Sequence, residues 1–310
     1  MIYCSVQPDV PYFHWQVRVF IDNFLEVGIQ PQQILPVFIY DGQPSLGSLR
    51  LQKDYPQVQF QWFQDGRKDR SYIPAIKPYG MWKLLEKQPN LNSEPIFYHD
   101  SDIIFLKKPD EDYLAKGKTW FLSDTVSYIG AKYCRSKGEE QFRAMCETVG
   151  VAPAEVIARE EGSGGAQYVV KGTGPAYWYK VYWDCKPLLE TMGAWSDKYR
   201  KEDPAHHPIQ AWTAEMWSTL WNAWFWGWET EVVPELAFSF ATDSIEKAKR
   251  LPIMHNAGVT GPHNGHFFKG NWTHQCPIHC EDDFSSVHPT TSSRLYVDAI
   301  LKSRKKWHKQ

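Results

Sequence analysis

The 310-residue sequence contains no hydrophobic run long enough to cross a bilayer, which takes about 18 to 20 consecutive apolar residues. Its densest apolar window, residues 212–228, is interrupted by the polar side chains Glu215, Ser218, Thr219 and Asn222. The first residues also lack the charged segment followed by an apolar stretch that marks a secretory signal. We therefore expect a protein without a membrane span, located in the cytoplasm, including the cytoplasm of a virus-infected cell.

Cysteine is scarce, and neither sign of charge is in excess. Six cysteines in a chain of this length are too few for a disulfide scaffold, so reduced thiols are expected. Thirty-four Lys and Arg against 36 Asp and Glu give a formal net charge of -2, which argues against binding of nucleic acid through overall positive charge. The hydrophobic fraction of 43% is ordinary for a folded protein, and no internal repeat or long linker divides the chain. One continuous domain is expected.

The first hundred residues alternate between strand and helix patterns. Short β-rich runs occupy residues 2–6, 34–40, 58–63 and 96–98, and apolar residues at helical spacing occupy residues 13–25 and 78–85. This order predicts an α/β fold, a mostly parallel sheet flanked by helices, in which ligands bind beyond the carboxyl ends of the strands. The second half predicts a polar loop at residues 160–165, a strand at 167–170, and helices at 175–191 and 208–226.

The segment Tyr98-His99-Asp100-Ser101-Asp102 carries the sharpest chemical signal. Asp100 and Asp102 stand where a buried apolar run ends, and a second apolar run follows them. Carboxylate oxygens are the ligands that Mg²⁺ and Mn²⁺ prefer, usually together with phosphate oxygens. A solvated acidic turn is the alternative, but the apolar residues on both sides favour a metal-phosphate site.

Several other segments accompany this aspartate pair. They are Ser5-Val6-Gln7 with Tyr12 and Trp15-Gln16, Gly164-Gly165-Ala166-Gln167-Tyr168, Ala211-Trp212-Thr213-Ala214-Glu215-Met216-Trp217, and Met254-His255-Asn256-Ala257-Gly258. Together with Asp100 and Asp102, these segments resemble the nucleotide-sugar-dependent glycosyltransferases of the GT-A fold. Within that fold, the opening Tyr12-Phe13-His14-Trp15-Gln16 and the helix segment Glu215-Met216-Trp217 look most like those of plant hydroxyproline arabinosyltransferases and peptidyl-serine galactosyltransferases. The resemblance implies a GT-A, Rossmann-like single domain at residues 1–260, with a C-terminal loop and basic tail at 261–310 packed on it.

The resemblance also implies an activity and its residues. It implies transfer of a sugar from a nucleotide donor, UDP-linked, to a hydroxyl acceptor, with Mn²⁺ or Mg²⁺ held by Asp100, Asp102 and His255. Donor contacts are then expected from Asp100 and from Ser5, Val6, Gln7, Trp15, Lys77, Gly164, Gly165 and Lys269. Glu215 and Gln167 are the expected catalytic residues, and the resemblance favours retention of the anomeric configuration.

Two of these assignments have alternatives. Glu215 is a general base if the enzyme inverts, a stabiliser of the positively charged sugar if it retains, and a helical carboxylate paired with a neighbour if it is structural. The histidine that completes the metal site is chosen among His255, His263 and His266.

A second cluster, His274, Cys276, His279 and Cys280, suggests zinc. Four side chains within seven residues are too close in the sequence to surround one tetrahedral ion, however, and the usual paired C-x₂-C spacing is absent. A Cys276–Cys280 disulfide is the other interpretation, although a reducing compartment disfavours it.

The acceptor is a glycan or a protein hydroxyl in the leading interpretation. A basic tail with one tryptophan, residues 302–309, suggests as an alternative a hydroxymethylated base in viral DNA. A further alternative is a non-catalytic carbohydrate-binding protein, because 15 Trp, 16 Tyr and 16 Phe include enough rings to stack on sugars. A nucleotidyltransferase is the other enzyme class, since paired aspartates also hold metals for phosphoryl transfer.

Overall fold

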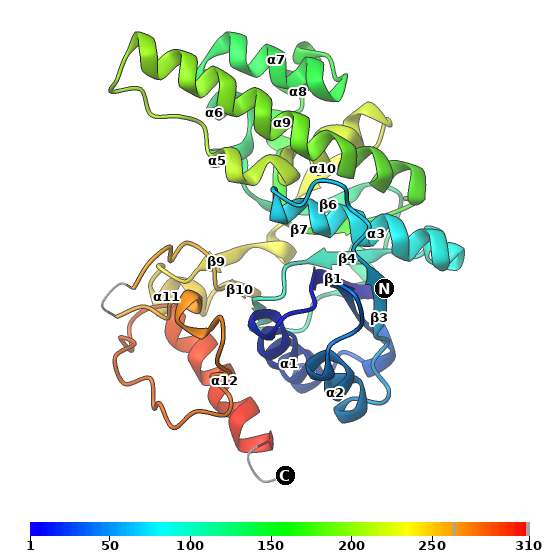
Figure 1. The fold of residues 1–310 in the computed structure, drawn as a ribbon, viewed down its shortest axis with the longest axis vertical. Helices are drawn as coiled ribbons and strands as arrows, with labels where there is room; N and C mark the ends of the chain where they lie inside the picture. The colour runs from blue at the N-terminus through cyan, green and yellow to red at the C-terminus, as the bar shows by residue number, and fades with distance from the viewer. Residues whose placement is uncertain (263–264, 308–310) are drawn as a thin grey trace. The chain divides into compact units, whose positions relative to one another are not determined.

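The computed structural model describes residues 1–262 and 265–307, which group into two compact units (Figure 1). Unit 1 comprises Met1, Gly66–Tyr98 and Asp112–Pro234, and unit 2 comprises Ile2–Asp65, His99–Glu111 and Glu235–Gln310. Both units are built from segments that alternate along the chain, so they are not consecutive domains joined by a linker. This arrangement agrees with the predicted single α/β domain, while the expected boundary at residue 260 stays a prediction.

Unit 2 begins with the predicted β-α-β pattern. Strands β1 (Ile2–Pro8), β2 (Ile34–Tyr40) and β3 (Gln61–Gln64) are parallel, in the order β3-β2-β1, and helices α1 (Pro11–Glu26) and α2 (Leu46–Asp54) connect them. β1 and β2 are buried over most of their length, and the buried residues of β1 include the polar side chains Ser5 and Gln7. Helix α1 starts with Pro11, which suits a first turn, and it buries one side that includes Trp15 and Val19. The third strand begins three residues later than predicted.

The rest of unit 2 forms a small sheet and a C-terminal helix. Strands β5 (Ile103–Phe105), β10 (Ile253–His255) and β9 (Phe238–Phe240) lie in that order in the sheet. Helix α11 (Ile245–Ala248) lies between β9 and β10 along the chain, and helix α12 (Ser293–Trp307) follows β10. β10 is antiparallel to β5, which pairs His255 with Ile103. Figure 1 shows α12 beside α1, and an aromatic core containing Trp15, Phe267 and Tyr296 packs there.

Unit 1 contains the strands β4 (Ile96–His99, whose last residue belongs to unit 2), β7 (Gly164–Val170), β6 (Trp120–Asp124) and β8 (Thr230–Val232), in that order. β7 is antiparallel to β4 and to β6, and β6 is parallel to β8. The predicted parallel pairing is therefore found in β1, β2 and β3 and between β6 and β8, whereas β7 is antiparallel to both of its neighbours in unit 1.

Helices surround these strands. They are α3 (Ile76–Lys87), α4 (Glu111–Leu114), α5 (Val126–Ile129), α6 (Ala131–Lys137), α7 (Glu139–Val149), α8 (Pro153–Ala158), α9 (Pro175–Glu202) and α10 (Ala214–Phe225). Short 3₁₀ helices lie at Pro31–Gln33, Ile73–Ala75, Pro89–Ser93, Glu160–Gly162, Ala211–Thr213, Pro234–Leu236 and Lys269–Trp272. α9 packs against α3, α7 and α10 (Figure 1).

Two predictions for these helices need correction. α9 continues eleven residues beyond 191, despite Pro187 within it. The helix predicted over residues 208–226 begins only at Ala214, and Trp212, which precedes it, is 59% exposed. Much of the aromatic content instead fills the interior, where Trp120, Trp178, Trp217, Trp221 and Trp224 are all buried.

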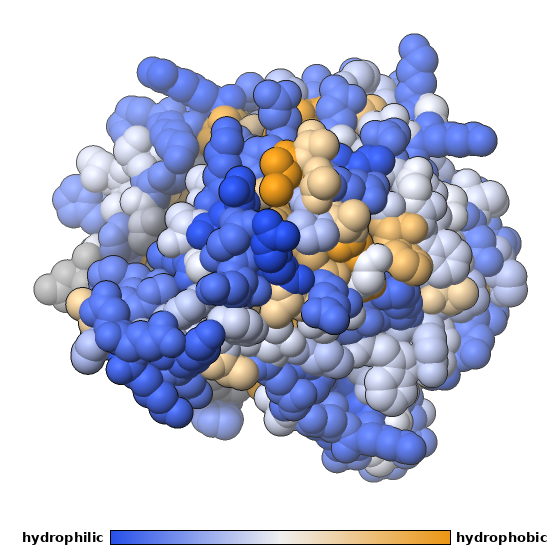
Figure 2. Space-filling model, turned by 90° about the horizontal axis from the view of Figure 1, so that it is seen from above, coloured by the Kyte–Doolittle hydropathy of each residue, from blue (hydrophilic) through white to orange (hydrophobic). Residues whose placement is uncertain are grey.

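The surface is mostly polar. The face seen in Figure 2 is largely hydrophilic, with a few hydrophobic side chains among charged ones, in keeping with a mean hydropathy of -0.50. Over the residues that the structure describes, none of the helices combines the length and the apolar character needed to cross a membrane.

Candidate active site

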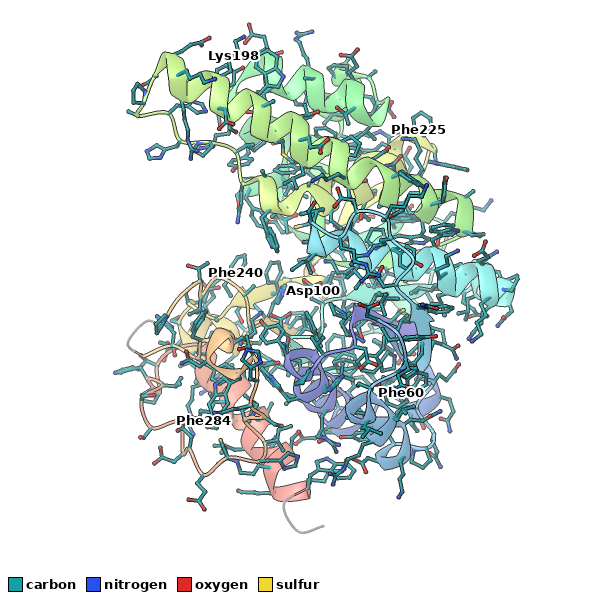
Figure 3. The ribbon with its side chains drawn as sticks, in the orientation of Figure 1. Phe60, Asp100, Lys198, Phe225, Phe240 and Phe284 are labelled. Carbon is teal, nitrogen blue, oxygen red and sulfur yellow. The ribbon has the colours of Figure 1, made fainter. Side chains whose placement is uncertain are left out.

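Asp100, Asp102 and His255 come together in unit 2. The two aspartates follow strand β4, and Asp100 is labelled in Figure 3. His255 ends β10, and its pairing with Ile103 brings the imidazole beside Asp102. His255 Nε2 lies 3.3 Å from Asp102 Oδ1 and 3.6 Å from Asp100 Oδ2. One donor atom from each residue lies within 4.8 Å of the others.

The environment of Asp102 keeps it charged. Burial by itself raises the pKa of this carboxyl, but the neighbouring charge of Lys269 and the contact with His255 together lower the pKa well below its usual range. Lys269 Nζ forms an ion pair with Asp102 Oδ2, and this charge raises the pKa of Lys269 against the effect of its own burial. Asp100 is the more open of the two carboxylates, because its side chain is 30% exposed against 7% for Asp102.

This donor set suits a divalent cation. Two carboxylates and one imidazole leave coordination positions for other oxygen ligands, as in sites shared with a phosphate group. Within residues 1–262 and 265–307, it is the one group of three or more such side chains whose donor atoms converge. His263 lies outside the described residues, and His266 is not part of the group.

A shell of buried polar groups adjoins the three side chains. Ser101 Oγ donates to Gln16 Oε1 over 3.1 Å, and the backbone N–H of Asn256 donates to the carbonyl oxygen of Asp102 over 2.9 Å. The Asn256 side chain is 1% exposed, and neither its oxygen nor its nitrogen has a hydrogen-bond partner among the described residues. Buried amides without partners are costly, so this side chain is a candidate ligand contact that sequence reasoning missed. Its position next to His255 was the only signal in the sequence.

The residues expected to meet the nucleotide from the N-terminal segment are all buried in unit 2. Ser5, Val6 and Gln7 lie in β1, and Gln7 Nε2 donates to the Val37 carbonyl over 3.0 Å. Ser5 Oγ and Gln7 Oε1 have no partner in the described part of the chain. Trp15 belongs to the aromatic core, where its indole nitrogen donates to the carbonyl of Trp272 over 3.2 Å. Their roles toward a nucleotide stay predictions.

Glu215 lies in unit 1, at the first turn of α10. Its side chain is buried and pairs with Lys77 Nζ over 2.9 Å, and the hydroxyl of Tyr98 donates to its Oε1 over 3.0 Å. Thr219 Oγ1 is 3.4 Å from the same oxygen. The expected donor-binding lysine Lys77 is therefore the ion-pair partner of the expected catalytic glutamate. Gln167, the other expected catalytic residue, is buried in β7 and accepts a hydrogen bond from Ser123 Oγ over 2.7 Å.

Gly164 and Gly165 belong to strand β7, where a loop was expected. A Cβ at Gly164 would lie 2.4 Å from Leu122 Cβ and 2.7 Å from the Ser123 carbonyl oxygen of β6. A Cβ at Gly165 would lie 2.5 Å from Met216 Cε. Close packing against β6 thus requires a glycine at position 164, whereas the nearest atom at Gly165 is the end of the flexible Met216 side chain, which can move.

The two remaining sequence features do not form sites of their own. His274, Cys276, His279 and Cys280 do not converge on one point, and both cysteines are free. The described part of the basic tail packs on unit 2: Lys302 pairs with Glu26 over 2.6 Å, Lys306 pairs with Asp22, and Trp307 Nε1 donates to Asp22 over 2.9 Å. Arg304 donates to the carbonyls of Pro277 and Asp282.

No protein-family model matches the sequence, and no curated protein matches it. Several solved structures are similar in fold. The bifunctional glycosyltransferase WbbM is 10% identical over 98% of this chain, with a TM-score of 0.51, and this chain spans about half (49%) of the WbbM structure. The galactosyltransferase LgtC, in complex with donor and acceptor sugar analogs, is 12% identical to this chain, with a TM-score of 0.46. The match includes 88% of this chain and 92% of the LgtC chain. An active-site mutant of LgtC is 10% identical, with a TM-score of 0.44, and the match includes 96% of this chain and 95% of the mutant's chain.

At such low identity the likeness to WbbM bears on the fold alone. It confirms the predicted α/β fold of GT-A type. The narrower resemblance to plant arabinosyltransferases and galactosyltransferases stays a prediction.

Proposed function

We propose that this protein is a divalent-metal-dependent glycosyltransferase that moves a sugar from a nucleotide diphosphate donor, UDP-linked, to a hydroxyl acceptor. The observation that carries the proposal is the convergence of Asp100, Asp102 and His255 just after strand β4, in a fold shared with a glycosyltransferase. Metal-binding carboxylates beyond a strand end are suited to hold a ligand that itself carries phosphate oxygens.

The chemistry explains why such a site is needed. Transfer breaks the bond between the anomeric carbon and a diphosphate oxygen, and negative charge grows on the departing diphosphate. A bound cation would neutralise that charge as a Lewis acid. Asp100, Asp102 and His255 would hold it, and the imidazole nitrogen in the set favours Mn²⁺ over Mg²⁺. Lys269, which is held at Asp102, adds a second positive charge to the same place.

Glu215 is proposed as the catalytic carboxylate of a retaining reaction. Its contacts with Lys77 and Tyr98 fix the carboxylate in one position and compensate its charge. A fixed carboxylate is suited to stabilise positive charge in the sugar ring, and it is less suited to the proton transfer that an inverting base performs. Gln167 is proposed as a second polar contact to the reacting sugar.

The acceptor is proposed to be a glycan or protein hydroxyl. Part of the positive charge of the described tail is offset, because Lys302 pairs with Glu26 and Lys306 pairs with Asp22, and this weakens the attraction of the tail for DNA. A hydroxymethylated DNA base is therefore the less favoured acceptor.

Turnover with a panel of UDP-sugars tests the proposal. We expect Mn²⁺ to support release of UDP, EDTA to stop it, and label from the donor to enter peptide or glycan acceptors rather than hydroxymethylated duplex DNA. Asp102→Asn should abolish release, whereas the matched change Asp197→Asn, at an exposed position of α9, should not. Absence of UDP release with every donor, at saturating Mn²⁺, would refute the proposed function.

A further inference from the structure

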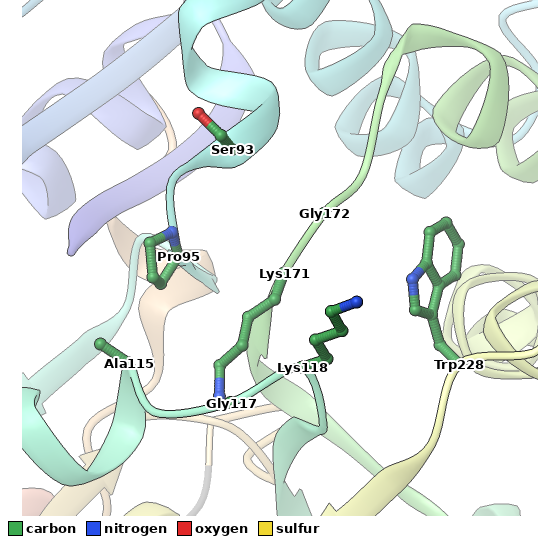
Figure 4. A pocket seen from close by; sticks show the side chains of 8 residues that line it. All are labelled: Ser93, Pro95, Ala115, Gly117, Lys118, Lys171, Gly172 and Trp228. Carbon is green, nitrogen blue, oxygen red and sulfur yellow. The ribbon is translucent and has the colours of Figure 1, made fainter.

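Unit 1 contains a cavity of about 420 Å³ that none of the proposed catalytic residues lines (Figure 4). The strand register places it at the start of β4, where Ile96 pairs with Val170, and beside the start of β6, where Phe121 pairs with Val169. Every residue that lines the cavity belongs to unit 1, and none of them is a residue of the candidate metal site.

The lining of the cavity is rich in hydrogen-bond donors and has no acidic residue. Lys118, Lys171, the indole of Trp228 and the hydroxyl of Ser93 line it together with two glycines, Gly117 and Gly172. Figure 4 shows the amino group of Lys118 pointing toward Trp228. A cavity with two ammonium groups and no carboxylate has an unbalanced positive charge.

Lys171 is the less usual of the two lysines, because it is only 6% exposed. Its Nζ donates to the Lys116 carbonyl over 2.7 Å and lies 4.2 Å from the centre of the Phe121 ring. No carboxylate pairs with it in the part of the chain that the structure describes. Burial without a counter-charge lowers the pKa of Lys171 to about 8, so the fold bears a cost at this position that an anion would relieve.

The other walls of the cavity include the stacked ring of Trp228 and two glycines, which have no side chain. Trp228 is stacked against Trp120 at 5.2 Å and against Trp226 at 6.0 Å, and its indole nitrogen lies 4.0 Å from the Cβ position of Gly172. Gly117 and Gly172 both have φ of +67°, a conformation that favours glycine and keeps side chains out of the cavity.

We propose that this cavity is a binding site for a phosphate monoester of a small molecule, such as a sugar phosphate, independent of the proposed transfer reaction. A phosphate monoester carries about two negative charges at neutral pH, which matches the two lysines. The indole N–H adds a neutral donor to the phosphate oxygens. A volume of about 420 Å³ exceeds the needs of phosphate alone and leaves room for the attached sugar.

Calorimetric titration in EDTA tests this proposal, with glucose 6-phosphate, inorganic phosphate and glucose as probes. We expect saturable binding of glucose 6-phosphate, weaker binding of phosphate and none of glucose. Lys118→Ala should weaken glucose 6-phosphate binding at least fivefold and Lys171→Met at least tenfold, while Lys198→Ala, an exposed lysine of the same unit, should leave it unchanged. Because Lys118 is exposed, its variant keeps the test valid if Lys171→Met does not fold.

Absence of saturable binding of both phosphate probes would overturn the proposal. Binding that survives both lysine substitutions but is lost in Asp102→Asn would also overturn it, because the probe would then occupy the metal site. Neither result says anything about UDP release, so the phosphate-binding site and the proposed function can each be refuted without the other.

Discussion

Lys269 and Asp102, 167 residues apart in the sequence, form an ion pair at the carboxylate that His255 also contacts. At the proposed metal site a lysine in this position would have two effects. It would compete with the proposed cation for Asp102, and it would attract the phosphate oxygens of the proposed donor.

Lys269→Met should separate these effects. Loss of a charge-assisted contact to the diphosphate costs about 1.5 to 3 kcal/mol, so we expect the KM for the UDP-sugar to rise about tenfold or more. The Mn²⁺ concentration for half-maximal rate should stay the same or fall, because Asp102 loses a competitor. Steady-state kinetics measure both, with Lys269→Arg as the charge-preserving control. A higher requirement for Mn²⁺ with an unchanged KM would place Lys269 outside donor binding.

The contributions of Glu215 and Lys77 to the free energy of unfolding should be coupled. Lys77→Met leaves a buried carboxylate uncompensated, which should cost on the order of 3 kcal/mol, the low end for buried pairs because Lys77 remains 20% exposed. Glu215→Gln in that background should restore much of the stability. Urea unfolding of the two single variants and the double variant measures the coupling, and additive losses would show that the pair is not coupled.

The kinetics of Glu215→Gln test its catalytic role. A carboxylate that acts in the transition state predicts a fall in kcat with little change in the KM for the donor. A variant that unfolds at the same urea concentration and turns over at the parental rate would leave Glu215 with a structural role only.

Asn256→Leu should affect ligand binding more than folding. Because both polar atoms of the amide are buried without partners among the described residues, its removal costs no protein hydrogen bond and should leave stability unchanged or raise it by about 1 kcal/mol. The KM for the donor should rise if a ligand supplies the missing partners. Thermal unfolding and kinetics on the same preparation give both values. A less stable variant with parental kinetics would contradict the assignment.

The lowered pKa of Lys171 predicts that stability depends on pH in a specific way. Its pKa of about 8 in the folded protein lies below the ordinary value of 10.5, so the unfolded chain binds more protons between these two pH values, and the parent gains stability as pH rises through that range. Lys171→Met has no such group. The stability of the variant relative to the parent should therefore fall between about pH 8 and 10.5. Urea unfolding at pH 7, 8.5 and 10 measures this difference, and a constant difference would mean that Lys171 titrates normally.

The sequence predicted the elements that depend on local pattern. β1, β2 and β4 are apolar runs bounded by turn residues, and Asp100 and Asp102 could be placed because they directly follow such a run. His255 reaches them only through the antiparallel pairing of β10 with β5, about 150 residues away along the chain. No local sequence pattern indicates that pairing, so the prediction of His255 as a metal ligand depended on the family resemblance.

Other features were misread because composition and tertiary packing conflict. The segment 160–165 is polar and glycine-rich, which is typical of a loop, yet Gly164 and Gly165 belong to strand β7, and Gly164 is needed where β7 passes close to β6. Lys171 follows the buried strand β7 and was not singled out from the sequence. Its burial comes from Lys116 and Phe121, which no local pattern connects to it.

The binding of UDP with and without Mn²⁺ tests the central claim most directly. If Asp100, Asp102 and His255 hold a cation that neutralises the charge of the diphosphate, calorimetry should show UDP binding at least tenfold tighter in Mn²⁺ than in EDTA. Asp102→Asn should remove this difference, and Asp197→Asn should keep it. Equal UDP affinity in Mn²⁺ and EDTA, or a Mn²⁺ effect that survives in Asp102→Asn, would contradict the proposed site.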